Sequence, residues 1–202
     1  MANSDTPWGL APIHFDEAAD CHYYPVTNNY GTALYVNDPV VRVNAGTIER
    51  ASTGDGAPIL GSIIALFVQN GVTSLLFPDN LTPVQYMAAT PGASLQYWAL
   101  VCDNPNVYFA AQEDGDTDDL AFADIGDNVN IIFTHAGNAT TGISGMEIDS
   151  NTEGTGATKQ LKLMWQFDHI EPASNVRTAL GDYCKWVVKI NNHQLAPNTA
   201  GI

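Results

Sequence analysis

The sequence predicts an all-β protein, a single-domain β-barrel or β-sandwich of the jelly-roll kind with an extended N-terminal arm. Short runs rich in Val, Ile, Thr and aromatic residues recur along the 202 residues, separated by clusters of Gly, Pro, Asn and Asp. Helical periodicity is nearly absent. Neither a composition break nor a repeat divides the chain, so we expect an arm over residues 1–20, one domain over 21–195 and a tail over 196–202.

The first 20 residues predict an arm because Pro7, Gly9 and Pro12 interrupt any regular periodicity. Large apolar side chains in this arm need a surface to lie on, and aromatic anchors dominate interface energetics. We therefore expect the arm to bind a partner through Trp8, Leu10, Ile13 and Phe15.

The later runs predict strands, and one short stretch, 117–125, predicts one or two helical turns capped by Thr117 or Asp118. The expected strands are Thr32–Val36, Val40–Asn44, Thr47–Ala51, Ile59–Gln69, Ser74–Phe77, Val84–Ala88, Gln96–Cys102, Val107–Gln112, Val129–Thr134, Gly145–Asp149, Gln160–Phe167 and Lys185–Asn191.

The run after Gln96 is almost wholly apolar through Cys102, which predicts a central strand. Turn chemistry follows at Asp103–Asn106, and the next apolar run begins at Val107. This order predicts a β-hairpin.

Polar and apolar residues alternate in the last strand, which predicts one buried face and one cationic outer face. Trp186, Val188 and Ile190 share the inner face, opposite Lys185 and Lys189. The two lysines are expected either to meet acidic patches on a partner or to guard a solvated edge strand against aggregation. In the strand before it, Lys162 is expected to face outward.

Charge excludes two classes of partner. The chain carries 22 acidic and 7 basic residues, a net charge of −15. Such a protein repels phosphate backbones, so nucleic acids and anionic membranes are not expected partners. No run approaches the ~20 apolar residues that cross a bilayer. Since no Lys or Arg occurs between Ala51 and Thr158, the molecule has either a uniformly solvated acidic surface or one solvent end and one docked end.

No motif predicts catalysis, a metal or a cofactor. Residues 142–145 fall one residue short of a nucleophile elbow, and the acidic stretch 113–119 lacks the Gly and Glu of an EF-hand loop. We expect that stretch to be a solvated tip, with weak Ca²⁺ binding as the alternative. The three separated cysteines, Cys21, Cys102 and Cys184, are expected to be reduced and buried.

Several stretches, taken in order, resemble one family of small proteins. They are the opening MANSDTPWGLAP, then PILGSIIA at 58–65, YWALVCDNPNVYF at 97–109 with QED at 112–114, and GDYCKWVVKINNHQ at 181–194. Together with Ala123–Gly126 and Thr141–Asp149 they cover nearly the whole chain, and they are similar to the capsid decoration, or cement, proteins of tailed bacteriophages.

The resemblance implies a virion structural protein, made in the host cytoplasm, that binds the outside of the head. Its partner would be the major capsid protein, and it would act as a homodimer or homotrimer that stabilises contacts between capsid subunits. It would not be an enzyme. The alternatives are a head-fibre or tail component, or a β-sandwich carbohydrate-binding or hydrolytic protein.

Overall fold

The computed structural model describes residues 3–69, 78–92, 94–171 and 176–196. The described chain is almost entirely β-structure in antiparallel sheets, which confirms the predicted all-β class. The sheets have the character of a sandwich and do not form a closed barrel.

The first sheet has the order β1-β10-β16-β13-β11-β12. Its strands are β1 (Ala11–Ile13), β10 (Tyr108–Gln112), β16 (Lys185–Ile190), β13 (Leu161–Gln166), β11 (Asn128–Ile132) and β12 (Glu147–Gly154). A bridge between Glu113 and Ile148 brings β12 back to the end of β10, so the sheet curls around its own core.

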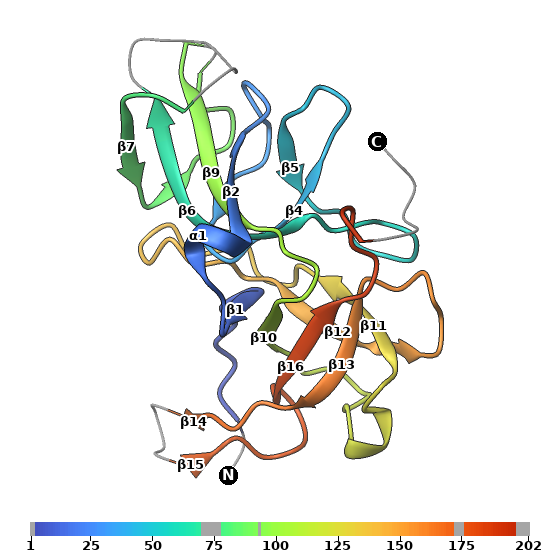
Figure 1. The fold of residues 1–202 in the computed structure, drawn as a ribbon. Helices are drawn as coiled ribbons and strands as arrows, with labels where there is room; N and C mark the ends of the chain where they lie inside the picture. The colour runs from blue at the N-terminus through green and yellow to red at the C-terminus, as the bar shows by residue number, and fades with distance from the viewer. Residues whose placement is uncertain (1–2, 70–77, 93, 172–175, 197–202) are drawn as a thin grey trace.

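The second sheet has the order β2-β9-β6-β4-β5, and β7 also pairs with β6. Its strands are β2 (Cys21–Pro25), β9 (Gln96–Cys102), β6 (Gly61–Gln69), β4 (Pro39–Arg42), β5 (Ile48–Arg50) and β7 (Leu81–Val84). Figure 1 shows this sheet above the first, with the helical turn α1 (Glu17–Asp20) between β1 and β2.

Two small ribbons complete the fold. One pairs β3 (Leu34–Tyr35) with β8 (Tyr86–Met87), and the other pairs β14 (Ile170–Glu171) with β15 (Val176–Arg177). No helix in the described ranges is long and apolar enough to span a membrane.

The larger hydrophobic core is shared between the two sheets. Phe109, Trp186 and Leu163 enter it from the first sheet, while Cys21 and Cys102 enter it from the second. A smaller cluster around Ile63 and Val101 fills the other side of the second sheet. The inner face predicted for β16 is confirmed, because Trp186, Val188 and Ile190 are all buried in the shared core.

The predicted hairpin of 97–112 is wrong. β9 already pairs with β2 on one edge and β6 on the other, so no edge remains for β10. The chain instead crosses at residues 103–107 from the second sheet to the first, where β10 pairs with β1 and β16. The turn-forming residues show where the strand ends, but they do not determine which strand the next one pairs with.

Other differences concern short elements. β1, β2, β7, β14, β15 and α1 were not expected, and most of them have four residues or fewer, too short to show a periodicity. The expected turns over 117–125 shrink to a 3-10 helix, η1 (Phe122–Asp124), capped by the Asp124 carboxylate accepting from the Ala121 amide at 2.7 Å rather than by Thr117 or Asp118. The expected strand Ser74–Phe77 lies outside the described residues.

Candidate docking face

The N-terminal arm lies on the molecule's own surface, and the structure separates its four apolar residues. Leu10 is fully buried in the shared core, and Phe15 packs against that core from its rim. Trp8 and Ile13 are only partly buried and lie on the outer face of the first sheet. The expectation that Leu10 reaches a partner is therefore wrong, since its side chain is taken up by this chain's own core.

Gly9 explains how the arm reaches that position. Its φ of +76° is in the region that glycine adopts without strain, and a Cβ there would lie 2.4 Å from the carbonyl oxygen of Asn37. The Asn37 carbonyl accepts a hydrogen bond from the Leu10 amide at 2.9 Å, and the Asn37 side chain donates to the Trp8 carbonyl at 2.9 Å. Gly9 thus permits the close approach between the arm and the Asn37 backbone, and this approach places Leu10 in the core.

The cationic outer face predicted for β16 is also corrected at Lys185. This side chain is fully buried, because the arm covers it. Its Nζ donates to the carbonyl oxygens of Ser4 at 3.0 Å and Tyr183 at 2.9 Å, and it lies over the Trp8 ring. Lys185 therefore fastens the arm and is not presented to a partner, whereas Lys189 remains partly exposed.

Strand register places one row of side chains across the outer face of the first sheet. Ile13 is opposite Tyr108 in the β1–β10 pairing. In the β10–β16 ladder, the register of Phe109 with Val188 puts Tyr108 beside Lys189, and Lys189 is paired with Lys162 of β13. The Lys189 ammonium lies 5.6 Å from the centre of the Tyr108 ring.

Aromatic side chains continue this face next to that row. Trp165 is 44% exposed and packs against Tyr108, with ring centroids 5.2 Å apart. Phe167 stacks on His169, and His169 packs against Trp8 at 5.4 Å. A hollow of about 290 Å³ opens between Trp8, Ile13, Phe167 and His169. We call these residues the docking face: Trp8, Ile13, Tyr108, Lys162, Trp165, Phe167, His169 and Lys189.

A β-bulge puts Trp165 on this face. Strict alternation from the inward-facing Leu161 and Leu163 would point Trp165 into the core. The register shifts by one residue between Leu163 and Trp165, so Trp165 pairs with Val187 on the outer side. Sequence reasoning missed Trp165 for this reason, whereas Tyr108 could have been found from its alternation with the buried Phe109.

The two lysines of the docking face have no carboxylate within ion-pair distance in the described part of the chain. Lys162 Nζ donates to the Gly126 carbonyl at 2.7 Å, and Lys189 Nζ donates to the Asn106 side chain at 3.4 Å. Like charges paired across two strands destabilise a sheet. A carboxylate supplied by a partner would remove that repulsion.

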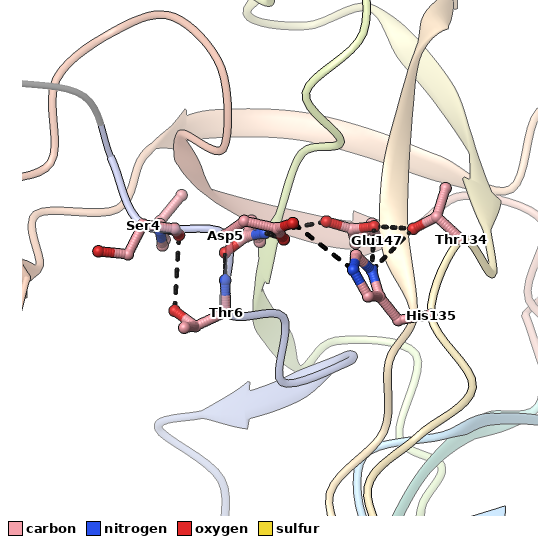
Figure 2. A network of polar contacts seen from close by, with 8 residues as sticks. Ser4, Asp5, Thr6, Thr134, His135 and Glu147 are labelled. Atoms are coloured by element: carbon pink, nitrogen blue, oxygen red, sulfur yellow. Dashed lines mark hydrogen bonds and ion pairs between the residues drawn. The ribbon is translucent and has the colours of Figure 1, made fainter.

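A polar network around Asp5, His135 and Glu147 also holds the start of the arm in place (Figure 2). Buried Glu147 accepts from Gln112 Nε2 at 2.9 Å, from His135 Nδ1 at 3.1 Å and from the Thr134 hydroxyl. His135 Nε2 lies 3.5 Å from Asp5 Oδ2, and Gln112 Nε2 also donates to Asp5 Oδ1 at 3.2 Å. The network ties Asp5 to two strands of the first sheet.

This network and a second carboxylate group have the donor types that bind metals. Asp5, His135 and Glu147 each offer a ligand atom within 4.8 Å of the others, as do Asp114, Asp116 and Asp149. Both oxygens of Glu147 and both nitrogens of His135 already have protein partners, which fits a role in holding the arm on the first sheet. A hollow of about 690 Å³ lies beside the network, and His135 is the only ionisable side chain among the described residues that line it.

The acidic stretch 113–119 is only in part the expected solvated tip, because 117–119 are exposed but its first two residues are not. Glu113 and Asp114 are buried, and Ser150 donates to Asp114 through both its amide, at 3.1 Å, and its hydroxyl, at 2.8 Å. Burial raises the pKa of Asp114, and it raises the pKa of Glu113 to about 8. Burial also raises the pKa of Asp149. The Asp114 carboxyl thus holds the end of β10 against β12, whereas the Glu113 carboxyl accepts from the Trp186 indole of β16 and from the Leu120 amide.

No family model, no curated protein and no solved structure matches this chain.

Proposed function

We propose that this chain is a virion structural protein that binds the outer surface of a tailed-phage head and stabilises contacts between major capsid subunits. The observation that carries the binding role is the docking face, an aromatic and apolar surface with two lysines on a chain of net charge −15. The choice of a phage head rests on the ordered sequence resemblance. Its motifs contribute to β6, β9, β10 and β16, each of which pairs with a strand on both sides.

The docking face has the composition expected of a protein contact. Interface energy is concentrated in a few aromatic anchors surrounded by a polar rim. Trp165 and Tyr108 form such a centre, with Trp8 and Phe167 beside the hollow and Lys189 and Lys162 along one side. The partner surface would therefore combine an apolar projection with carboxylates, and binding would weaken as salt screens the lysines.

Heads that lack this protein, assembled from the capsid protein encoded in the same genome, provide the test. Purified protein is added and bound protein is measured by co-sedimentation. We expect Trp165→Ala and Lys189→Glu each to weaken binding by roughly tenfold or more.

Matched controls lie away from the docking face. Phe122→Ala removes another exposed aromatic ring, 59% exposed on η1, and Arg42→Glu reverses the charge of an exposed cation on β4 of the second sheet. Both controls should bind as the wild type does. Wild-type protein that does not sediment with heads would contradict the proposed function; unchanged binding by both docking-face variants would contradict this surface. Electron micrographs of the complexes would separate a head decoration from a head-fibre or tail component.

Glycan binding is the second candidate, because exposed Trp and Tyr side chains on a β-sheet also stack against sugars. The Tyr108 and Trp165 rings are inclined by 49° and so do not form one flat platform, which favours a protein partner. Binding in a glycan array that is lost in Trp165→Ala would support this second candidate instead.

A further inference from the structure

Two of the three cysteines lie directly opposite each other in the second sheet. Cys21 of β2 is paired with Cys102 of β9, although 80 residues separate them in the chain. Both are free thiols, and both side chains enter the same core cluster. They therefore point to the same side of the sheet.

The ladder around this pair determines its geometry. The amide of Asp103 donates to the carbonyl of Asp20 at 2.9 Å, and the amide of Val26 donates to the carbonyl of Tyr97 at 2.9 Å. Hydrogen-bonded pairs alternate with non-hydrogen-bonded pairs in an antiparallel ladder, so the two cysteines occupy a non-hydrogen-bonded pair. The Cα atoms of such a pair are about 4.5 Å apart, within the range of about 4.4–6.8 Å that a disulfide spans.

The two thiols are close enough for each to influence the pKa of the other. Cys184, the third cysteine, is also buried, but its thiol contacts Gln166 and the Lys185 carbonyl instead of another cysteine. The chain thus contains one preformed dithiol and one isolated thiol.

Access to the dithiol is unequal. Cys21 is 7% exposed and lines a surface hollow of about 360 Å³ together with Glu17, Ala18, Tyr23 and Leu100. Cys102 is completely buried behind it. A small reagent can therefore reach Cys21 first, and Cys102 only through Cys21.

We propose that Cys21 and Cys102 are a redox-active pair that forms a cross-strand disulfide when the protein meets a small-molecule disulfide oxidant. The Cys21 thiolate attacks one sulfur of the oxidant, forms a mixed disulfide and releases one thiol. The Cys102 thiolate then attacks the Cys21 sulfur, forms the Cys21–Cys102 bond and releases the second thiol. Two protein thiols lose two electrons and two protons, and one oxidant disulfide becomes two thiols.

Burial makes this reaction slow, because it raises the pKa of both thiols and so lowers the fraction of reactive thiolate. The rate should therefore increase as pH rises. A slow rate also lets the reduced pair persist where reduced thiols are in excess.

Glutathione disulfide, with folded full-length protein, is the test. Intact mass and non-reducing peptide mapping should show the loss of two hydrogens and a peptide that joins Cys21 to Cys102. Cys184→Ser should form the same bond at the same rate. Cys102→Ser should stop at a glutathione adduct on Cys21, and Cys21→Ser should leave Cys102 unmodified.

The oxidised protein should also be more stable, because the bond closes a loop of roughly 80 residues and ties the edge strand β2 to β9. We expect Tm to rise by on the order of 5–10 °C and to return on reduction. Wild-type protein that keeps three free thiols at pH 8.5 with excess oxidant would overturn the proposal. So would a disulfide that includes Cys184, or an adduct at Cys102 in the Cys21→Ser variant.

Discussion

At the scale of single residues, Glu113 is the least expected group in the molecule. Its side chain is fully buried, and one carboxyl oxygen accepts from both the Trp186 indole, at 3.1 Å, and the Leu120 amide, at 3.2 Å. The other oxygen has no hydrogen-bond partner among the described residues. Burial therefore raises its pKa from an ordinary 4.5 to about 8, so this glutamate is largely protonated at neutral pH.

The raised pKa gives stability a defined pH dependence. Between about pH 4.5 and 8 the folded state binds a proton that the unfolded state has lost, so the free energy of unfolding falls as pH rises. We expect Glu113→Gln to remove this slope, which amounts to at most about 1.4 kcal/mol per pH unit. Urea denaturation at several pH values from 6.5 to 8 measures it.

The pH range chosen for the Glu113 experiment separates Glu113 from Asp38, and the chain also offers a matched control variant. Asp38 has the same sign of dependence, but its pKa is raised only to about 6, so it contributes little above pH 6.5. Glu153→Gln removes an exposed carboxylate and should keep the wild-type slope. Parallel pH profiles for wild type and Glu113→Gln would contradict a neutral buried glutamate.

At the scale of elements, the arm is part of the domain's architecture. β1 extends the first sheet at β10, Leu10 fills the shared core, and Trp8 Nε1 donates to the Ala110 carbonyl at 3.2 Å. Removing the arm would therefore take away core packing together with part of the docking face. A truncation does not separate binding from folding, whereas single substitutions do.

Leu10 and Ile13 should differ sharply in their effect on stability. Leu10→Ala leaves a cavity in the core and should lower the free energy of unfolding by about 2–5 kcal/mol. Ile13→Ala lies on the partly exposed outer face and should cost clearly less. Urea denaturation of the two variants measures the difference, and equal losses would contradict the placement of Leu10 in the core.

The sequence predicted the class, the central strands and the inward residues of β16, because long alternating runs report burial directly. It did not predict which strands are neighbours, since the 103–107 connection looks like a hairpin turn in either arrangement. Trp8, Ile13 and Lys189 were expected to bind a partner; they lie on the outer face of the first sheet, and their binding role stays a prediction. Leu10 and Lys185 are not presented on that face, because the arm folds back over the domain and buries both side chains. This is a long-range contact, and no local sequence pattern predicts it.

At the scale of the whole molecule, the shared core couples the two sheets. Cys21, Leu100 and Cys102 of the second sheet pack in the same cluster as Trp186 and Phe109 of the first. Neither sheet can open completely without exposing apolar surface of the other. We therefore expect the sheets to unfold as one cooperative unit.

Hydrogen exchange in increasing urea tests this coupling. Peptides from β6 and β9 should become exchangeable with the same denaturant midpoint as peptides from β13 and β16. Exchange from β14 and β15, a two-stranded ribbon outside both sheets, should occur earlier. Two separate midpoints for the two sheets would instead indicate two independent folding units.

The one-residue bulge at Met164 has a consequence for how this surface can change over generations. Which side of the sheet Trp165 occupies depends on counting residues, not on their chemistry, because neighbouring positions alternate between interior and exterior. Deleting one residue there would turn the Trp165 indole inward, and Tyr108 would lose the ring that packs against it. Insertions and deletions in β13 can therefore change the proposed docking face in a single step that no point substitution reproduces.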